Sequence, residues 1–140
     1  MTFDDLPTVI VGTTATCKFI VAQLSYGGRK KTVLRATDLC KYHAGILNRT
    51  LWRKYHTHTC AGNNAPREEY LCEKCDCGCE VRIRCLGGGR IRVDADAKTV
   101  HIWDRSGGYG LEPDRETATV AMLRTAYPEY EIACEQPDVW

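Results

Sequence analysis

Residues 75–103, CDCGCEVRIRCLGGGRIRVDADAKTVHIW, carry the pattern that decides the fold class. Side chains that favour burial alternate with polar ones over 75–85, which predicts a long half-buried strand. The three glycines at 87–89 are expected to end that strand. The residues that follow predict a β-hairpin, with strands over 90–93 and 99–103 on either side of an acidic turn.

The flanking sequence adds strands and helices on both sides of this stretch. Apolar and β-branched residues predict strands over 17–25 and 30–36, joined by a glycine turn. A stripe of mostly apolar residues at helical spacing predicts a helix from about 38 to 54. A second helix over about 115–126 is stopped before a proline, and a strand over 129–134 follows it. This order of elements predicts an α+β domain with a mixed or antiparallel sheet.

Composition predicts one ordered domain over residues 1–140. The hydrophobic content is 44% and the charged content 26%, which argues against disorder. No apolar run is long enough to cross a membrane, and the first residues lack the features of a secretion signal. We therefore expect a soluble monomer in the cytoplasm that does not bind membranes, and a mitochondrial location stays an open alternative.

The two halves of the chain differ in charge although the total is only +1. Residues 1–67 hold 10 Lys/Arg and 3 Asp/Glu, a balance of +7, and residues 68–140 hold 9 and 15, a balance of −6. The basic half predicts a surface for an anionic partner. Its charges are too dispersed to specify a nucleic acid.

Six of the nine cysteines lie between residues 60 and 85. Cys72, Cys75, Cys77 and Cys79 have a spacing that could supply four zinc ligands. However, consecutive side chains on one face of a strand lie about 6.5–7 Å apart, which is too far to share one ion unless the backbone turns. We therefore favour small buried side chains over a zinc site, which is kept as the alternative.

His43 is the histidine with two plausible roles. It falls on the apolar stripe of the first predicted helix, where a buried ring could simply bind a backbone carbonyl. Alternatively, one ring nitrogen could face a pocket and act as a base or nucleophile. Two glycine-rich loops, 87–89 followed by Arg90 and 106–110, could aim backbone N–H groups and a guanidinium at an anion. Periodicity alone leaves both roles open.

Four short motifs follow one another along the chain: Lys41-Tyr42-His43-Ala44-Gly45-Ile46, Cys85-Leu86-Gly87-Gly88-Gly89-Arg90-Ile91, the loop Ser106–Gly110, and Ala126-Tyr127-Pro128-Glu129-Tyr130-Glu131. In this order they resemble the small phosphohistidine phosphatases of the janus/ocnus family. The similarity covers about residues 17–134, the predicted core.

This resemblance implies a single domain with a mixed β-sheet flanked by two helices. It further implies an enzyme that removes phosphate from phosphohistidine-containing proteins without a metal or other cofactor. His43 would be the catalytic base or nucleophile. The implied phosphate-binding residues are Lys18, Arg35, Arg90, Ser106 and Gly108.

The chain departs from the family in a basic and Cys-rich insertion at about 52–84. The insertion leaves the matched positions intact, but it raises a second possibility. The chain could be a non-catalytic member that binds RNA or a phosphoprotein within a larger assembly.

Overall fold

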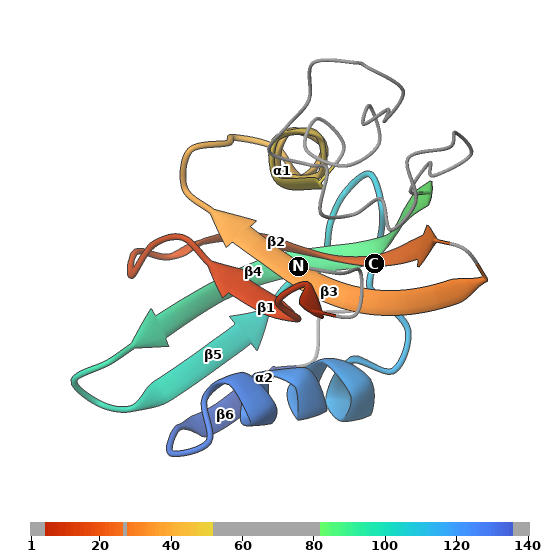
Figure 1. Cartoon of the computed structure of the whole chain (residues 1–140). Helices are drawn as coiled ribbons and strands as arrows, with labels where there is room; N and C mark the ends of the chain where they lie inside the picture. The colour runs from red at the N-terminus through yellow and green to blue at the C-terminus, as the bar shows by residue number, and fades with distance from the viewer. Residues whose placement is uncertain (1–4, 27, 52–81, 136–140) are drawn as a thin grey trace.

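The computed structural model describes residues 5–26, 28–51 and 82–135, which form a six-stranded mixed sheet with a helix on each face (Figure 1). The strand order is β1-β3-β2-β4-β5-β6; β1 is parallel to β3 and β6 to β5, while the inner pairs are antiparallel. The predicted α+β class is confirmed. The elements are β1 (Val9–Val11), β2 (Cys17–Tyr26), β3 (Arg29–Thr37), α1 (His43–Leu47), β4 (Arg82–Asp94), β5 (Thr99–Trp103), the π-helical turn η4 (Arg115–Thr119), α2 (Val120–Ala126) and β6 (Glu131–Cys134).

Strand β2 occupies the middle of the sheet because it is apolar on both faces. Phe19 and Val21 pack in the core on the α2 side, and Ile20 and Leu24 pack in the core on the α1 side. All four side chains are at most 2% exposed. A strand buried on both faces reads as a nearly continuous apolar run, so it was recognisable in the sequence. The predicted strands over 17–25 and 30–36 and the 90–103 hairpin are confirmed.

The prediction that glycines 87–89 end a strand is wrong. They lie inside β4, which runs unbroken over 13 residues, with a register shift opposite Val21 and Ala22. A Cβ on Gly87 would lie 2.3 Å from the backbone nitrogen of Glu112, so this position admits only glycine. The glycines therefore allow other backbone to cross the strand closely.

The first helix is shorter than predicted. It begins at His43, not near residue 38, and Leu39 and Tyr42 are 68% and 63% exposed. The apolar spacing over 38–42 therefore belongs to a connecting segment. Residues 52–54 of the predicted helix, and 75–81 of the predicted strand, lie outside the described residues. The short edge strand β1 was not predicted.

The C-terminal helix and strand are confirmed, although the helix starts with a π-helical turn. No helix in the described parts of the chain is long and apolar enough to span a membrane.

A buried polar network fastens the start of this helical segment to β4. The Arg115 guanidinium donates to the Glu112 carboxylate from Nε at 3.0 Å and from Nη2 at 2.6 Å. It also donates to the main-chain carbonyls of Gly88, at 2.9 Å, and Asp104. The Thr119 hydroxyl donates to the same carboxylate at 2.9 Å. Because the buried guanidinium of Arg115 and the buried carboxylate of Glu112 are paired and hydrogen-bonded, their charges are compensated.

Replacing Arg115 by Met should lower the free energy of unfolding by about 3–5 kcal/mol, because the Glu112 carboxylate would stay buried without its partner. Urea unfolding followed by circular dichroism measures this. Arg124→Met, on an exposed position of α2, is the matched control and should change stability by no more than about 0.5 kcal/mol. Equal effects of the two substitutions would contradict the role of the network.

Candidate functional site

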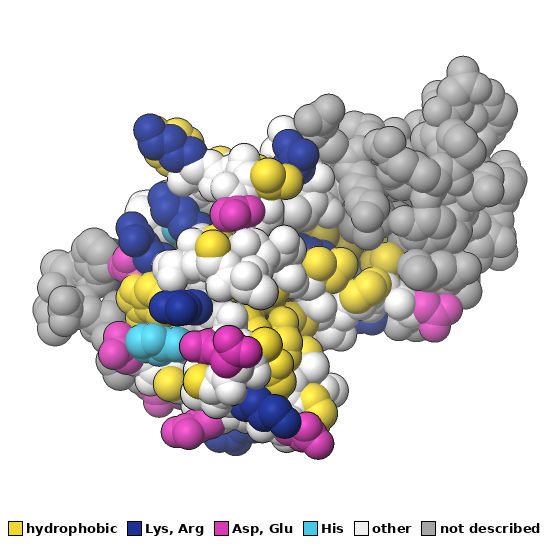
Figure 2. All heavy atoms as spheres, turned by 90° about the vertical axis from the view of Figure 1, so that its left-hand side faces the viewer, with side chains coloured by type: hydrophobic (Ala, Val, Ile, Leu, Met, Phe, Trp, Pro, Cys, Tyr) yellow, Lys and Arg dark blue, Asp and Glu magenta, His cyan; other side chains and the backbone are white. Residues whose placement is uncertain are grey.

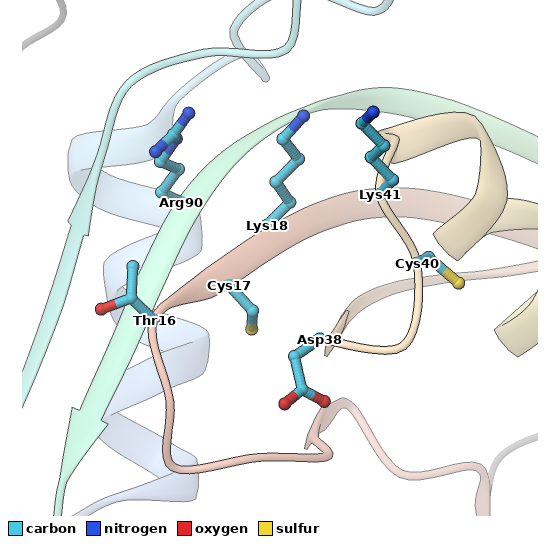
Figure 3. A pocket seen from close by; sticks show the side chains of 7 residues that line it. All are labelled: Thr16, Cys17, Lys18, Asp38, Cys40, Lys41 and Arg90. Carbon is cyan, nitrogen blue, oxygen red and sulfur yellow. The ribbon is translucent and has the colours of Figure 1, made fainter.

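A pocket of about 220 Å³ opens where β2 begins, beside β4 and the connection from β3 to α1 (Figure 3). Its lining is polar and contains three cations and one acid. The lining residues are Thr16, Cys17, Lys18, Asp38, Cys40, Lys41 and Arg90.

The three cations project to the same side of the sheet. Lys18 and Arg90 are directly paired across β2 and β4, and Lys41 comes from the β3–α1 connection. Figure 3 shows their side chains pointing the same way, whereas Cys17 and Asp38 point to the opposite side. The structure thus brings two of the expected phosphate-binding residues together and adds Lys41, which had no predicted role.

The His43 ring lies on the backbone of β4 next to these cations. Its Nε2 is 3.0 Å from the carbonyl oxygen of Gly89. A carbonyl oxygen only accepts hydrogen bonds, so Nε2 carries the hydrogen. In the neutral ring the lone pair is then on Nδ1, which is the nitrogen able to accept a proton or act as a nucleophile.

Glycine at position 88 makes this placement of the ring possible. A Cβ on Gly88 would lie 3.1 Å from Cδ2 of His43 and 2.1 Å from the carbonyl oxygen of Phe19. Any side chain here would therefore collide with the backbone of β2 and press against the ring.

The environment of His43 keeps its ring neutral. The side chain is 9% exposed, and this burial is the main cause that lowers its pKa below the ordinary value of 6.5. The hydrogen bond to Gly89 acts in the opposite direction, as does the charge of Asp104; Lys18 and Arg90 lower the pKa further. His43 does not itself line the pocket, but it lies close enough to Lys18 and Arg90, which do, for their charges to lower its pKa. A neutral imidazole is the form that a base or nucleophile requires.

Arg35 is not grouped with the other cations. Its side chain is 2% exposed, and its guanidinium donates to main-chain carbonyls of Pro7, Thr8 and Leu34. These bonds hold the segment before β1 against β3. The contact between Arg35 and phosphate that the resemblance implies stays a prediction; the structure shows this guanidinium buried and hydrogen-bonded to main-chain carbonyls.

The 106–110 loop is anchored to the same glycine strip. Ser106 is 1% exposed; its N–H donates to the Gly88 carbonyl at 2.9 Å, and its hydroxyl accepts from the Tyr109 N–H at 3.1 Å. Gly107 and Gly108 are exposed, and within the described part of the chain their N–H groups donate to no other group. Contact of Ser106 and Gly108 with phosphate stays a prediction.

Two of the described cysteines, Cys17 and Cys85, are poor nucleophiles. Burial, with a smaller contribution from Asp38, raises the pKa of Cys17 to about 11. Burial likewise raises the pKa of Cys85 to about 11. Both thiols are therefore protonated at neutral pH.

The possible zinc ligands Cys72, Cys75, Cys77 and Cys79 lie outside the described residues. Over the described ranges, no group of three or more His, Cys, Asp or Glu side chains is arranged to hold a metal ion.

Asp104, like Lys41, belongs to the site but had no role predicted from the sequence. Its carboxylate is 3.3 Å from Nε of Arg90, and its backbone has a φ of 67°. The Arg115 guanidinium donates a hydrogen bond to the Asp104 main-chain carbonyl. Asp104 thereby orients Arg90 beside His43. Nothing in the local pattern distinguished it from other loop acids, whereas Lys41 stood in the motif that contains His43.

The wider surface is mixed in charge. On the face in Figure 2, Lys and Arg side chains gather toward the upper left, and acidic, basic and hydrophobic side chains alternate lower down. This face carries a small basic area, which differs from the extended basic stripe typical of nucleic-acid binding.

Gly88→Ala should destabilise the protein by about 3 kcal/mol, because the added methyl group collides with the backbone of β2. Thermal or urea unfolding measures the effect. Gly108→Ala is the control: its Cβ would meet nothing within 4 Å, so stability should hardly change. A stable Gly88→Ala protein would show that the close packing at this position is wrong.

An NMR titration should place the pKa of His43 below 6.5, and Lys18→Gln should raise it, because a neighbouring positive charge is removed. Because the folded state has the lower pKa, the unfolded chain binds the His43 proton more tightly than the folded protein does. Stability should therefore fall as the pH drops from 6.5 to the lower pKa of the folded state, and His43→Gln should remove that contribution. A folded-state pKa at or above 6.5 would contradict this electrostatic description.

Comparison with known proteins agrees with the resemblance seen in the motifs. The Janus/Ocnus family model matches residues 3–131. Sex-regulated protein janus-A of Drosophila yakuba is 27% identical over 128 residues, covering 91% of this chain and 77% of that protein. The 14 kDa phosphohistidine phosphatase of Homo sapiens is 28% identical over 102 residues, covering 73% of this chain and 62% of that protein. Because the match spans nearly the whole chain, this protein belongs to the Janus/Ocnus family.

Proposed function

We propose that this protein is a metal-independent protein phosphohistidine phosphatase, a hydrolase that cleaves the P–N bond of phosphohistidine in other proteins. Relatives named phosphohistidine phosphatase support the reaction class. One observation carries the proposal. His43 is neutral, and its Nε2 donates a hydrogen bond to the Gly89 carbonyl. Its Nδ1 therefore has a lone pair that can accept a proton or attack phosphorus, and the ring lies beside Lys18 and Arg90.

The cations would bind and polarise the phosphoryl group. Its transition state carries charge on three equatorial oxygens, so the catalyst must supply a positive field. Lys18 and Arg90 are adjacent across two strands and point to the same side, which suits them to hold these oxygens (Figure 3). Arg90 offers a guanidinium fork to phosphate, and the exposed N–H groups of Gly107 and Gly108 are further candidate donors.

His43 could act by either of two routes. As a base, its Nδ1 takes a proton from water while the water oxygen bonds to phosphorus; the P–N bond breaks, and the proton passes to the leaving imidazole. As a nucleophile, Nδ1 bonds to phosphorus and releases the substrate imidazole, which takes up a proton; water then cleaves the new P–N bond. Both routes need the neutral ring, so the rate should fall as the pH drops below the pKa of His43.

The decisive test is phosphate release from a phosphohistidine protein in the presence of a metal chelator. His43→Ala and His43→Gln should each lower the rate by about 10²- to 10⁴-fold, because the base is lost. The Gln variant retains an N–H donor for the Gly89 carbonyl, so its fold should be preserved. His101→Ala is the control, since His101 lies on β5 and pairs with Glu135. Activity of both His43 variants at the wild-type level would refute the assignment.

A non-catalytic binding module is the second candidate function. The low exposure of His43 and the separation of Arg35 from the pocket favour it, because both leave fewer groups for catalysis. In that case the cations would bind RNA or a phosphoprotein. RNA binding with a steep salt dependence, together with no phosphate release, would support this function over the enzyme.

A further inference from the structure

The cationic pocket extends beyond the groups that act on His43. The charges that shift the His43 pKa are those of Lys18, Arg90 and Asp104. Lys41 lines the same pocket but lies on the far side of Lys18 from Arg90 (Figure 3). The pocket therefore contains one cation, Lys41, in addition to the two that we assign to phosphate binding.

Within the described ranges, no carboxylate is at ion-pair distance from Lys18 or Lys41. Asp38 lines the pocket, but its carboxylate accepts a hydrogen bond from the Thr13 hydroxyl and points away from the cations (Figure 3). Arg90, in contrast, is paired with Asp104. The two lysines thus offer the pocket uncompensated positive charge.

Tyr42 places both lysines. The Nζ atoms of Lys18 and Lys41 lie 5.5 Å and 5.6 Å from the centre of its ring, within the range of cation–π attraction. The ring is 63% exposed, so a bound ligand can reach it. This contact limits the freedom of two otherwise flexible ammonium groups, which reduces the entropy lost when they bind an anion.

We propose that Lys41 forms a second anion subsite, which binds the carboxylate of an Asp or Glu residue next to the phosphohistidine of the substrate protein. The inference rests on the proposed function and adds a substrate preference to it. A phosphoryl dianion held by Lys18 and Arg90 leaves Lys41 for a separate negative group. In a protein substrate, the nearest such group is an acidic side chain flanking the phosphorylated residue.

The test compares three phosphohistidine peptides that differ only in their flanking residues, which are Glu, Ala or Lys. For the wild-type protein, kcat/KM should be about two- to five-fold higher with Glu than with Ala, as expected for one exposed ion pair, and lower with Lys. Lys41→Gln should remove this preference, and Lys41→Glu should reverse it. Lys30→Gln and Lys30→Glu, exposed changes toward the other end of β3, should keep the wild-type ratios.

Binding separates this inference from the proposed function. NMR titrations with the His43→Gln protein, with and without Lys41→Glu, measure the affinity for each peptide without turnover. If the wild-type protein releases no phosphate but Glu peptides still bind better through Lys41, the phosphatase assignment fails and the subsite stands. If phosphate is released but the Glu-to-Lys ratio is flat, or does not reverse in Lys41→Glu, the subsite is overturned.

Discussion

The site depends on one contact, the His43 ring lying against the bare backbone of Gly88 and Gly89. The Gly89 carbonyl selects the ring tautomer. The Gly88 carbonyl accepts bonds from Arg115 and from the Ser106 N–H. The start of the C-terminal helical segment, the 106–110 loop and the His43 ring are therefore attached to two consecutive peptide groups of β4. Side chains at these positions would separate all three.

Opposing electrostatic effects act on His43, and burial is the strongest. Desolvation and the cations Lys18 and Arg90 favour the neutral ring, while the Gly89 carbonyl and Asp104 favour the charged one. The result is a neutral ring that adds no positive charge of its own to that of the two cations. An imidazole able to accept a proton and a pair of cations can thus lie in one small site.

Local patterns succeeded wherever burial follows a single period. Strand β2 and the β4–β5 hairpin carry alternation or continuous apolarity, and both were predicted. The same logic failed at Leu39 and Tyr42, whose helical spacing is accidental because both side chains are exposed on a connecting segment and are not buried in the core. It failed again at the glycine run, where a residue without a side chain indicates a turn as readily as a close crossing of two backbones.

The sequence by itself indicated the strands other than β1 and the two helical regions, because these follow from residue patterns within a few positions. The role expected for His43 came instead from the resemblance of short motifs to a known family, since periodicity left it open. Only the tertiary structure decided which cations meet that histidine. Strand pairing sets Lys18 opposite Arg90, 72 residues later in the chain, whereas hydrogen bonds with the segment before β1 bury Arg35. Pairings between distant segments depend on register and packing of the whole sheet, and no local pattern encodes them.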